Sequence, residues 1–137
     1  MRSQKEIVMQ PRERGIHLVT NEILQDLTAL PEVGLLNLFI THTSAALSIN
    51  ENVDPDVRTD MEYILDRLVP DIDLNYIHTA EGPDDASSHT KTSIIGPSIT
   101  LPITRGRLNL GTWHGIYLLE FREYKLARHI IATITGE

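Results

Sequence analysis

Hydrophobic residues fall into short blocks along the chain, and most of these blocks predict β-strands. Residues 34–41 form a near-continuous apolar run, which is typical of a buried strand. Further strands are predicted at residues 3–10, 45–49, 98–103, 116–121 and 128–134, several of them rich in β-branched and aromatic side chains. The pair Ile94–Ile95 is also typical of a strand. The C-terminal third is therefore predicted to be mostly β-sheet.

Two segments instead repeat apolar residues every three or four positions, which predicts helices. In the first, Thr20 is the candidate cap, and the helix extends to about Leu30, just before a proline. In the second, Asp54 is the cap and Pro55 takes the first helical position, and the next proline ends the helix. The predicted apolar face of this second helix consists of Val57, Met61, Ile64, Leu65 and Leu68.

The organisation of these elements predicts the fold class. Residues 71 to about 92 are predicted to form one long polar loop, and a loop of that length is uncommon unless it is functional or mobile. Two or three helices beside many strands, without regular alternation, predict an α+β fold dominated by an antiparallel or mixed β-sheet. No repeat or linker divides the chain, so residues 1–137 are predicted to form a single domain.

Composition and charge argue against several classes of function. The 137 residues include no cysteine, which excludes disulfides, thiolate metal sites and a cysteine nucleophile. The formal net charge of −7 argues against a nucleic-acid partner, because a surface that binds nucleic acid needs clustered Lys and Arg. No stretch approaches the length of a membrane span and the N-terminus is not a secretory signal. We therefore expect a cytoplasmic protein with no membrane partner.

Residues 76–89 carry the densest group of chemically competent side chains. This segment holds two histidines and three carboxylates around a Gly-Pro pair: His78, Glu81, Asp84, Asp85 and His89. Neutral imidazole binds transition metals, and carboxylates ligate metals, orient ligands or move protons. The alternative is a solvated acidic loop with incidental histidines, since no fixed-period motif is present. The density of ionisable side chains favours the interpretation that this segment supplies half of an active site.

A second candidate segment, Thr41–Ala45, places His42 between hydroxyl side chains at the end of the predicted buried strand. The functional interpretation is that His42 is a metal ligand or proton-transfer group and that Thr43 and Ser44 hold an anion. The alternative is a polar strand terminus with a hydrogen-bonded histidine.

Further candidates lie on both sides of the second helix and in the C-terminal half. Glu51 precedes the helix cap and is a candidate acid or base. Backbone N–H groups beside Gly111 are suited to phosphate, while Trp113 either stacks on a flat heterocycle or is part of the core. The positive charges available for a phosphate are Lys91, Arg105, Arg107 and Arg122.

The motifs, taken in order, resemble those of the YjbQ family, also called the secondary thiamine-phosphate synthase family. The resemblance runs nearly end to end and includes Gly15–Thr20, His42–Ala45, Asn50–Asn52, Glu81–Gly82, Ser88–His89, Gly111–Trp113 and Ile130–Thr133. One departure is visible: the family usually has glutamine where this chain has His114, which adds a possible extra ligand.

The resemblance implies a compact α+β fold assembled as a homotrimer. It also implies a cleft, lined by His42, His78 and His89, that holds a metal ion or an anion, and a thiamine-phosphate synthase activity. That reaction joins a pyrimidine-methyl diphosphate to a thiazole phosphate.

The hypothesis that fits these residues is a divalent metal, Zn²⁺ or Mg²⁺, on the three histidines, with acid–base or ligand roles for the carboxylates Glu51, Glu81 and Asp85. The phosphorylated substrate would contact Thr43, Ser44, Ser88, Lys91, Arg105, Gly111, Thr112, Trp113 and His114. Two alternatives remain: a metal-dependent hydrolase of a phosphorylated small molecule, and a non-catalytic trimer that binds a metabolite or metal.

Overall fold

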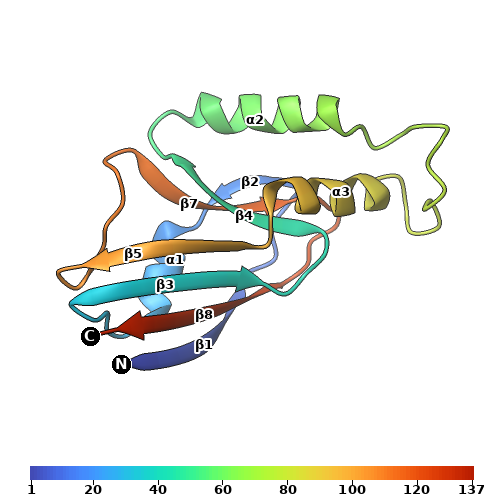
Figure 1. The fold of residues 1–137 in the computed structure, drawn as a ribbon. Coiled ribbons are helices and arrows are strands. Elements are labelled where there is room, and N and C mark those ends of the chain that lie inside the picture. The colour runs from blue at the N-terminus through green and yellow to red at the C-terminus, as the bar shows by residue number, and fades with distance from the viewer.

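Two antiparallel β-sheets and three helices make up the structure, a computed structural model that describes residues 1–137 (Figure 1). The larger sheet has the strand order β1-β8-β3-β5-β6, and the smaller has the order β2-β7-β4. This confirms the predicted α+β class. In chain order the elements are β1 (Arg2–Met9), β2 (Gly15–Leu18), α1 (Thr20–Asp26), β3 (Val33–Ile40), β4 (Ala45–Glu51), α2 (Pro55–Leu68), α3 (Asp85–Ile95), β5 (Ser98–Thr104), β6 (Arg107–Leu108), β7 (His114–Glu120) and β8 (Arg128–Gly136).

The main hydrophobic core lies between the two sheets. Strand β3 contributes Leu36, Leu38 and Ile40 to it, and the facing strand β7 contributes Ile116 and Leu118. The residues that alternate with them on β3 point outward, and among these Leu35 and Phe39 are exposed. The apolar run that predicted β3 is therefore buried on one face only, as in an antiparallel sheet with one solvated side.

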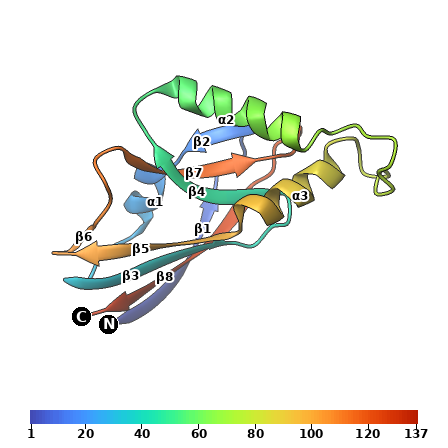
Figure 2. The ribbon, with the colours of Figure 1, turned by 45° about the horizontal axis from the view of Figure 1, so that its top comes forward.

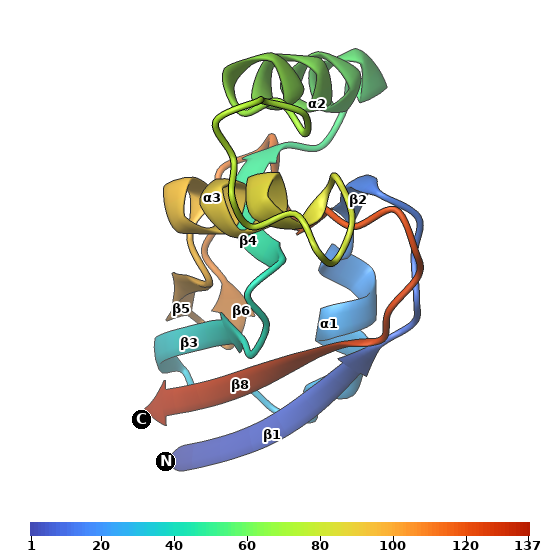
Figure 3. The same cartoon turned by 90° about the vertical axis from the view of Figure 1, so that its right-hand side faces the viewer.

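Helices α2 and α3 cover the outer face of the smaller sheet, so the molecule is layered as large sheet, core, small sheet and helices (Figures 1 and 2). A second apolar cluster lies beneath them and consists of Ala46, Tyr117, Leu119 and Phe121. Viewed from the side, α3 lies between α2 and the large sheet (Figure 3). This places the start of α3 beside the chain that links β3 to β4.

The predicted boundaries of the first helix are wrong. Helix α1 ends at Asp26, because Leu27 already has an extended backbone, and Leu27 and Leu30 pack against the main core as a coil. Thr20 does not cap the helix, since Val19 occupies that position. The Thr20 hydroxyl instead accepts a hydrogen bond from the backbone N–H of Ile116 at 2.8 Å, which ties α1 to β7.

The second helix follows the prediction closely. Asp54 caps α2 by accepting a hydrogen bond from the N–H of Asp56 at 2.9 Å, and the helix ends at Leu68. The predicted apolar face is only partly directed inward, since Ile64 and Leu68 are 52% and 71% exposed. None of the three helices is long and apolar enough to cross a membrane.

The prediction of one loop over residues 71 to about 92 is wrong, because α3 begins at Asp85. The pair Ile94–Ile95 is the last turn of this helix rather than a strand, and Gly96 ends it with a φ of 107°. The segment has few strong helix formers and little apolar periodicity, so its helix depends on tertiary contacts that the sequence pattern does not show.

Candidate metal centre

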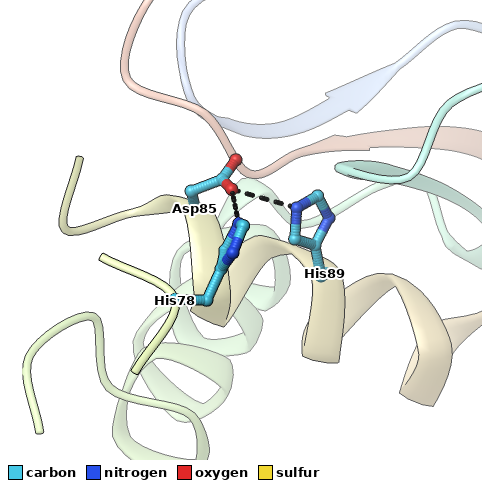
Figure 4. Close-up of side chains that lie close together, drawn as sticks. All are labelled: His78, Asp85 and His89. Atoms are coloured by element: carbon cyan, nitrogen blue, oxygen red, sulfur yellow. Dashed lines mark hydrogen bonds and ion pairs between the residues drawn. The ribbon is translucent and has the colours of Figure 1, made fainter. Parts of the chain in front are cut away.

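Three ligand-type side chains converge at the start of α3: His78, Asp85 and His89 (Figure 4). The Oδ2 atom of Asp85 lies 2.5 Å from Nε2 of His78 and 3.0 Å from Nε2 of His89. One ligand atom from each residue lies within 4.8 Å of the other two. The residues therefore form a compact group of two nitrogens and one oxygen.

Local structure brings these side chains together. Asp85 and His89 are four residues apart on α3 and so share one face of the helix. His78 comes from the segment between α2 and α3 and reaches the same carboxylate from the other side (Figure 4). Asp85 is fully buried, whereas the side chains of His78 and His89 are 53% and 40% exposed. The group is therefore anchored inside and open to solvent on one side.

Arg122 holds the Asp85 carboxylate in place from the interior. Its guanidinium contacts Oδ1 of Asp85, donates from Nε to Oδ2 of Asp84 at 3.1 Å, and donates from Nη2 to the carbonyl of Glu81 at 3.1 Å. Burial alone would raise the pKa of Asp85, but the hydrogen bond from His78 and the charges of His89 and Arg122 outweigh it. The pKa of Asp85 is therefore held below its usual value and the group is a carboxylate.

The second ring nitrogen of His89 fixes its tautomer. Nδ1 lies 2.8 Å from the carbonyl oxygen of Thr43, which only accepts hydrogen bonds, so Nδ1 carries a proton. In the neutral ring Nε2 then presents a lone pair to the Asp85 carboxylate. Two lone pairs at 3.0 Å need a proton or a cation close by. A backbone carbonyl on Nδ1, with Nε2 turned toward a carboxylate and left to bind a proton or a cation, is an arrangement that suits a metal-binding histidine.

His42 does not belong to this group. Its Nε2 accepts a hydrogen bond from the backbone N–H of His129 at 2.9 Å, and the two rings lie 5.6 Å apart. Burial is the main cause that lowers the pKa of His42, and the nearby charges of Arg128 and His129 add to it. His42 instead lines a hollow of about 860 Å³ that also touches His89.

The hollow that His42 lines, called the His42 hollow below, lies between the C-terminal end of β3 and helix α3. It is lined by Phe39, Ile40, Thr41, His42, Thr43, His89, Thr92, Ser93 and Pro97. His89 is the residue that the hollow shares with the His78–Asp85–His89 group. A small molecule in the hollow would therefore lie directly beside that group, and the volume is in the usual range for ligand pockets.

Several residues predicted to bind an anion are engaged elsewhere. Lys91 is fully buried, and its Nζ pairs with Asp66 at 2.5 Å. The Ser88 hydroxyl is buried and donates to the carbonyl of Asp85 at 2.6 Å. Ser44 is buried, and its carbonyl accepts from the Arg128 guanidinium at 3.2 Å. The Glu81 side chain is exposed, and only its carbonyl contacts the group, through Arg122.

The remaining predicted residues lie at the opposite end of the small sheet. Glu51 and His114 are paired in register where β4 ends and β7 begins, whereas Thr43 precedes the start of β4. Seven residues of strand separate the two ends by about 20 Å. Oε2 of Glu51 is buried without a partner there. The other residues at that end are Gly111, Thr112 and Trp113, which precede β7, and Arg105 is in the turn between β5 and β6.

Sequence reasoning gave too little weight to Arg122 and Asp84. Arg122 follows an apolar strand and was considered only as a free charge for phosphate, whereas it is buried against both aspartates. Asp84 accepts from Arg122 and from the backbone N–H of Glu123 at 2.7 Å. The available signal was the doubled acid Asp84–Asp85, because two adjacent buried carboxylates need a cation nearby.

Comparison with known proteins finds one matching family and relatives that align with nearly the whole chain. Residues 5–137 match the family model described as "UPF0047 protein YjbQ-like". The chain is 51% identical to the UPF0047 protein YjbQ of Escherichia coli O157:H7, over 98% of each chain. It is 50% identical to the protein of the same name from Salmonella typhimurium, again over 98% of each.

Solved structures agree with the fold. A protein of the YjbQ/UPF0047 family from Clostridium acetobutylicum has a TM-score of 0.81 and 31% identity, and the match covers 96% of this chain and 99% of that one. A protein of unknown function from Sulfolobus solfataricus, described as YbjQ-like, has a TM-score of 0.86 at 21% identity, over 100% and 99% of the two chains, which shows the fold alone.

Fold and site together define a small α+β protein with two antiparallel sheets and a histidine-flanked buried carboxylate at the start of a polar helix. The matches above show its family. The chain belongs to the YjbQ-like UPF0047 family, which confirms the resemblance found in the sequence motifs.

Proposed function

We propose that this chain is a metal-dependent enzyme that hydrolyses a phosphorylated small molecule at His78, Asp85 and His89. The observation that carries the proposal is the state of His89, whose Nδ1 proton is committed to the Thr43 carbonyl while Nε2 faces the Asp85 carboxylate. A cation between Nε2 of His89, Nε2 of His78 and the Asp85 carboxylate would satisfy all three atoms, which lie within 4.8 Å of one another.

The donor set fits a divalent transition metal. Two imidazole nitrogens and one carboxylate oxygen match the three-ligand pattern of catalytic zinc sites, in which further positions stay open. Mg²⁺ prefers an all-oxygen environment, so the two nitrogens favour Zn²⁺. A bound metal of this kind would supply Lewis-acid polarisation of a phosphoryl oxygen.

The surrounding residues have their own roles in this proposal. Arg122 keeps Asp85 ionised and oriented, and the Thr43 carbonyl keeps the His89 ring in one tautomer. The exposed edge of His78 leaves the group open to solvent water. Substrate would enter through the His42 hollow, which shares His89 with the group.

Thiamine-phosphate synthesis is the second candidate, and the volume of the hollow favours it. About 860 Å³ leaves room for two ring-bearing substrates side by side. Release of diphosphate, however, calls for positive side chains. Lys91 is paired with Asp66 and Arg105 lies at the far hairpin, so neither supports that role. Hydrolysis therefore fits the charges of this region better.

The test replaces each proposed ligand by alanine and measures bound Zn²⁺ by equilibrium dialysis and elemental analysis. Both His78→Ala and His89→Ala should weaken Zn²⁺ binding by about 100-fold or more and abolish turnover of a phosphate-ester panel. His17→Ala is the matched control, since His17 lies on β2 and the hydrogen bond of its ring is to the carbonyl of Glu13. Equal Zn²⁺ affinity in all three variants would rule out the site.

The same protein preparation separates the candidate functions. Turnover of phosphate esters alone supports hydrolysis, and joining of a pyrimidine-methyl diphosphate to a thiazole phosphate supports the synthase. Tight Zn²⁺ or phosphate binding without either reaction supports the non-catalytic alternative.

We also propose that the chain assembles as a homotrimer. The support is a set of apolar side chains, each more than half exposed, on α2 and the segment after it: Tyr63, Ile64, Leu68, Ile72, Leu74 and Ile77. Six exposed apolar side chains within residues 63–77 are more than scattered surface positions, and an exposed apolar surface is typical of protein interfaces.

A further inference from the structure

The His42 hollow differs in chemistry from the metal centre beside it. None of its nine lining residues is Asp, Glu, Lys or Arg. Its titratable groups are two histidines, and both ring nitrogens of His89 are already engaged, one with Thr43 and one facing Asp85. The lining of the hollow therefore carries no Asp, Glu, Lys or Arg side chain, and its one contact with the metal centre is His89.

His42 offers the hollow a single neutral donor. Because Nε2 accepts a hydrogen bond from the N–H of His129, the proton of the neutral ring is on Nδ1. Nδ1 has no partner within the protein. The one side-chain polar atom that is both buried and unpartnered is Oε2 of Glu51. Because Nδ1 of His42 is also unpartnered, it cannot be buried, and a ligand in the hollow can reach it. The lowered pKa of His42 keeps the ring uncharged near neutral pH.

The other polar groups of the hollow divide into engaged and free hydroxyls. Thr41 and Thr92 donate to the carbonyls of His129 and Ala45, at 3.2 and 3.4 Å. The hydroxyls of Thr43 and Ser93 make no hydrogen bond within the protein and are on exposed residues. Phe39, which is 43% exposed, and Pro97 add apolar surface.

A phosphate group would find no Lys or Arg among the lining residues, and the nearby Arg128 is buried and paired with Glu120. An uncharged ring or carbonyl compound would find apolar contact and hydrogen-bond donors. We infer that the His42 hollow binds the uncharged organic part of the substrate, and that His42 selects it by donating a hydrogen bond from Nδ1 to an acceptor atom such as a ring nitrogen or carbonyl oxygen. This inference rests on the proposed function, which places the phosphoryl group at His78, Asp85 and His89.

His42 is therefore assigned as a specificity-determining residue rather than a third metal ligand. Metal binding at Nδ1 would require that atom to lose its proton and Nε2 to gain one, which would break the hydrogen bond from His129. Donation from Nδ1 leaves that bond intact.

The test uses two uncharged probes that differ in one acceptor atom, pyridin-4-ylmethanol and benzyl alcohol. Binding to ¹⁵N-labelled protein is followed by NMR at roughly pH 8, where both probes and His42 are uncharged. The pyridine compound should bind about 5-fold more tightly than benzyl alcohol, the usual effect of one neutral hydrogen bond, and should shift the signals of residues in the hollow.

Two variants separate the roles of the two ring nitrogens. His42→Gln keeps a carbonyl oxygen near the position of Nε2, which accepts from His129, but has no donor at the position of Nδ1. It should bind both probes equally, with the affinity for benzyl alcohol unchanged. His42→Asn carries an amide donor near the position of Nδ1 and should retain the preference.

Equal affinities in the unmodified protein, a preference that survives His42→Gln, or shifts outside the hollow would each overturn the assignment of His42. None of these measurements involves metal or turnover. Failure here therefore leaves the metal proposal standing, and failure of the His78 and His89 tests does not change the binding result.

Discussion

Helices α2 and α3 lie side by side over the same sheet, yet they are held by opposite means. Helix α2 has the apolar periodicity of a core helix, but none of its residues is buried. Helix α3 has a mostly polar sequence, but five of its residues are buried: Asp85, Ser87, Ser88, Lys91 and Thr92. Apolar periodicity in the sequence therefore located α2 correctly, but it did not indicate how deeply α2 or α3 is buried.

Ion pairs attach the C-terminal end of α2 to the rest of the molecule. Asp66, near its C-terminal end, pairs with Arg14 at 3.1 Å and with Lys91 of α3 at 2.5 Å. Asp71, just beyond the helix, pairs with Arg14 at 2.7 Å and accepts from Ser87 of α3 at 2.6 Å. Among the apolar side chains of α2, the partly buried Leu65 packs against the second apolar cluster.

Helix α3 tolerates burial because its polar side chains have partners. Ser87 donates to Asp71, Ser88 to the carbonyl of Asp85, and Lys91 to Asp66. An unpaired polar group in the same place would cost more than its hydrogen bond contributes. The buried polar helix is therefore specific to this one arrangement, which is a property suited to holding Asp85 and His89 in fixed positions.

The largest expected effect follows from removing the cation beneath α3. Arg122→Met should leave Asp84 and Asp85 buried without their partner and lower the free energy of unfolding by about 3–5 kcal/mol. Urea denaturation measures this. Arg107→Met, on the exposed strand β6, is the control and should stay within about 0.5 kcal/mol of the unmodified protein. Similar values for the two variants would contradict the assigned role of Arg122.

A medium effect is expected where α2 joins α3. Burial alone would raise the pKa of Asp71, but hydrogen bonds from Arg14 and Ser87 outweigh it, so its pKa in the folded protein is lowered. A depressed carboxyl pKa stabilises the fold above the unfolded pKa of about 3.9, and the stabilisation is lost as pH falls through the folded value. Asp71→Asn should therefore cost about 1–2 kcal/mol at neutral pH and progressively less below pH ~4.

Unfolding free energies measured in urea across this pH range would show whether the two curves converge on the acid side. Asp60→Asn is the control, because Asp60 is an exposed residue of α2 that makes no ion pair. A constant difference between Asp71→Asn and the unmodified protein at every pH would contradict the ionic attachment of α2.

The sequence predicted the fold class because the strands obey local rules. Residues 34–41, 98–103 and 128–134 have β-branched and apolar patterns that hold without tertiary information, and the corresponding strands β3, β5 and β8 are present. Strands β2 and β6 have four and two residues, too few to show an alternating pattern. Helix α3 was missed because its stability comes from partners distant in sequence, such as Asp66.

The candidate site could be predicted only in part for a related reason. His78, Asp85 and His89 lie within twelve residues of one another, so their clustering was visible in the sequence. Whether Glu51 and His114 join them depends on the direction of β4 and β7, which places them at the far end of the sheet. The engagement of His42 with the backbone of His129 is likewise a consequence of how β3 and β8 pair, and no motif records it.

The smallest effect on the stability of one chain is expected on the outer side of α2. Ile64→Ser combined with Leu68→Ser removes apolar groups that are already 52% and 71% exposed, so the free energy of unfolding of the single chain should change by less than about 0.5 kcal/mol each. If these residues form the proposed trimer interface, the same double variant should shift the sedimentation coefficient from that of a trimer to that of a monomer. Val8→Ser, on β1 of the other sheet, is a matched exposed control and should leave the assembly intact. A double variant that sediments like the unmodified protein would show that the exposed apolar residues of α2 do not serve assembly.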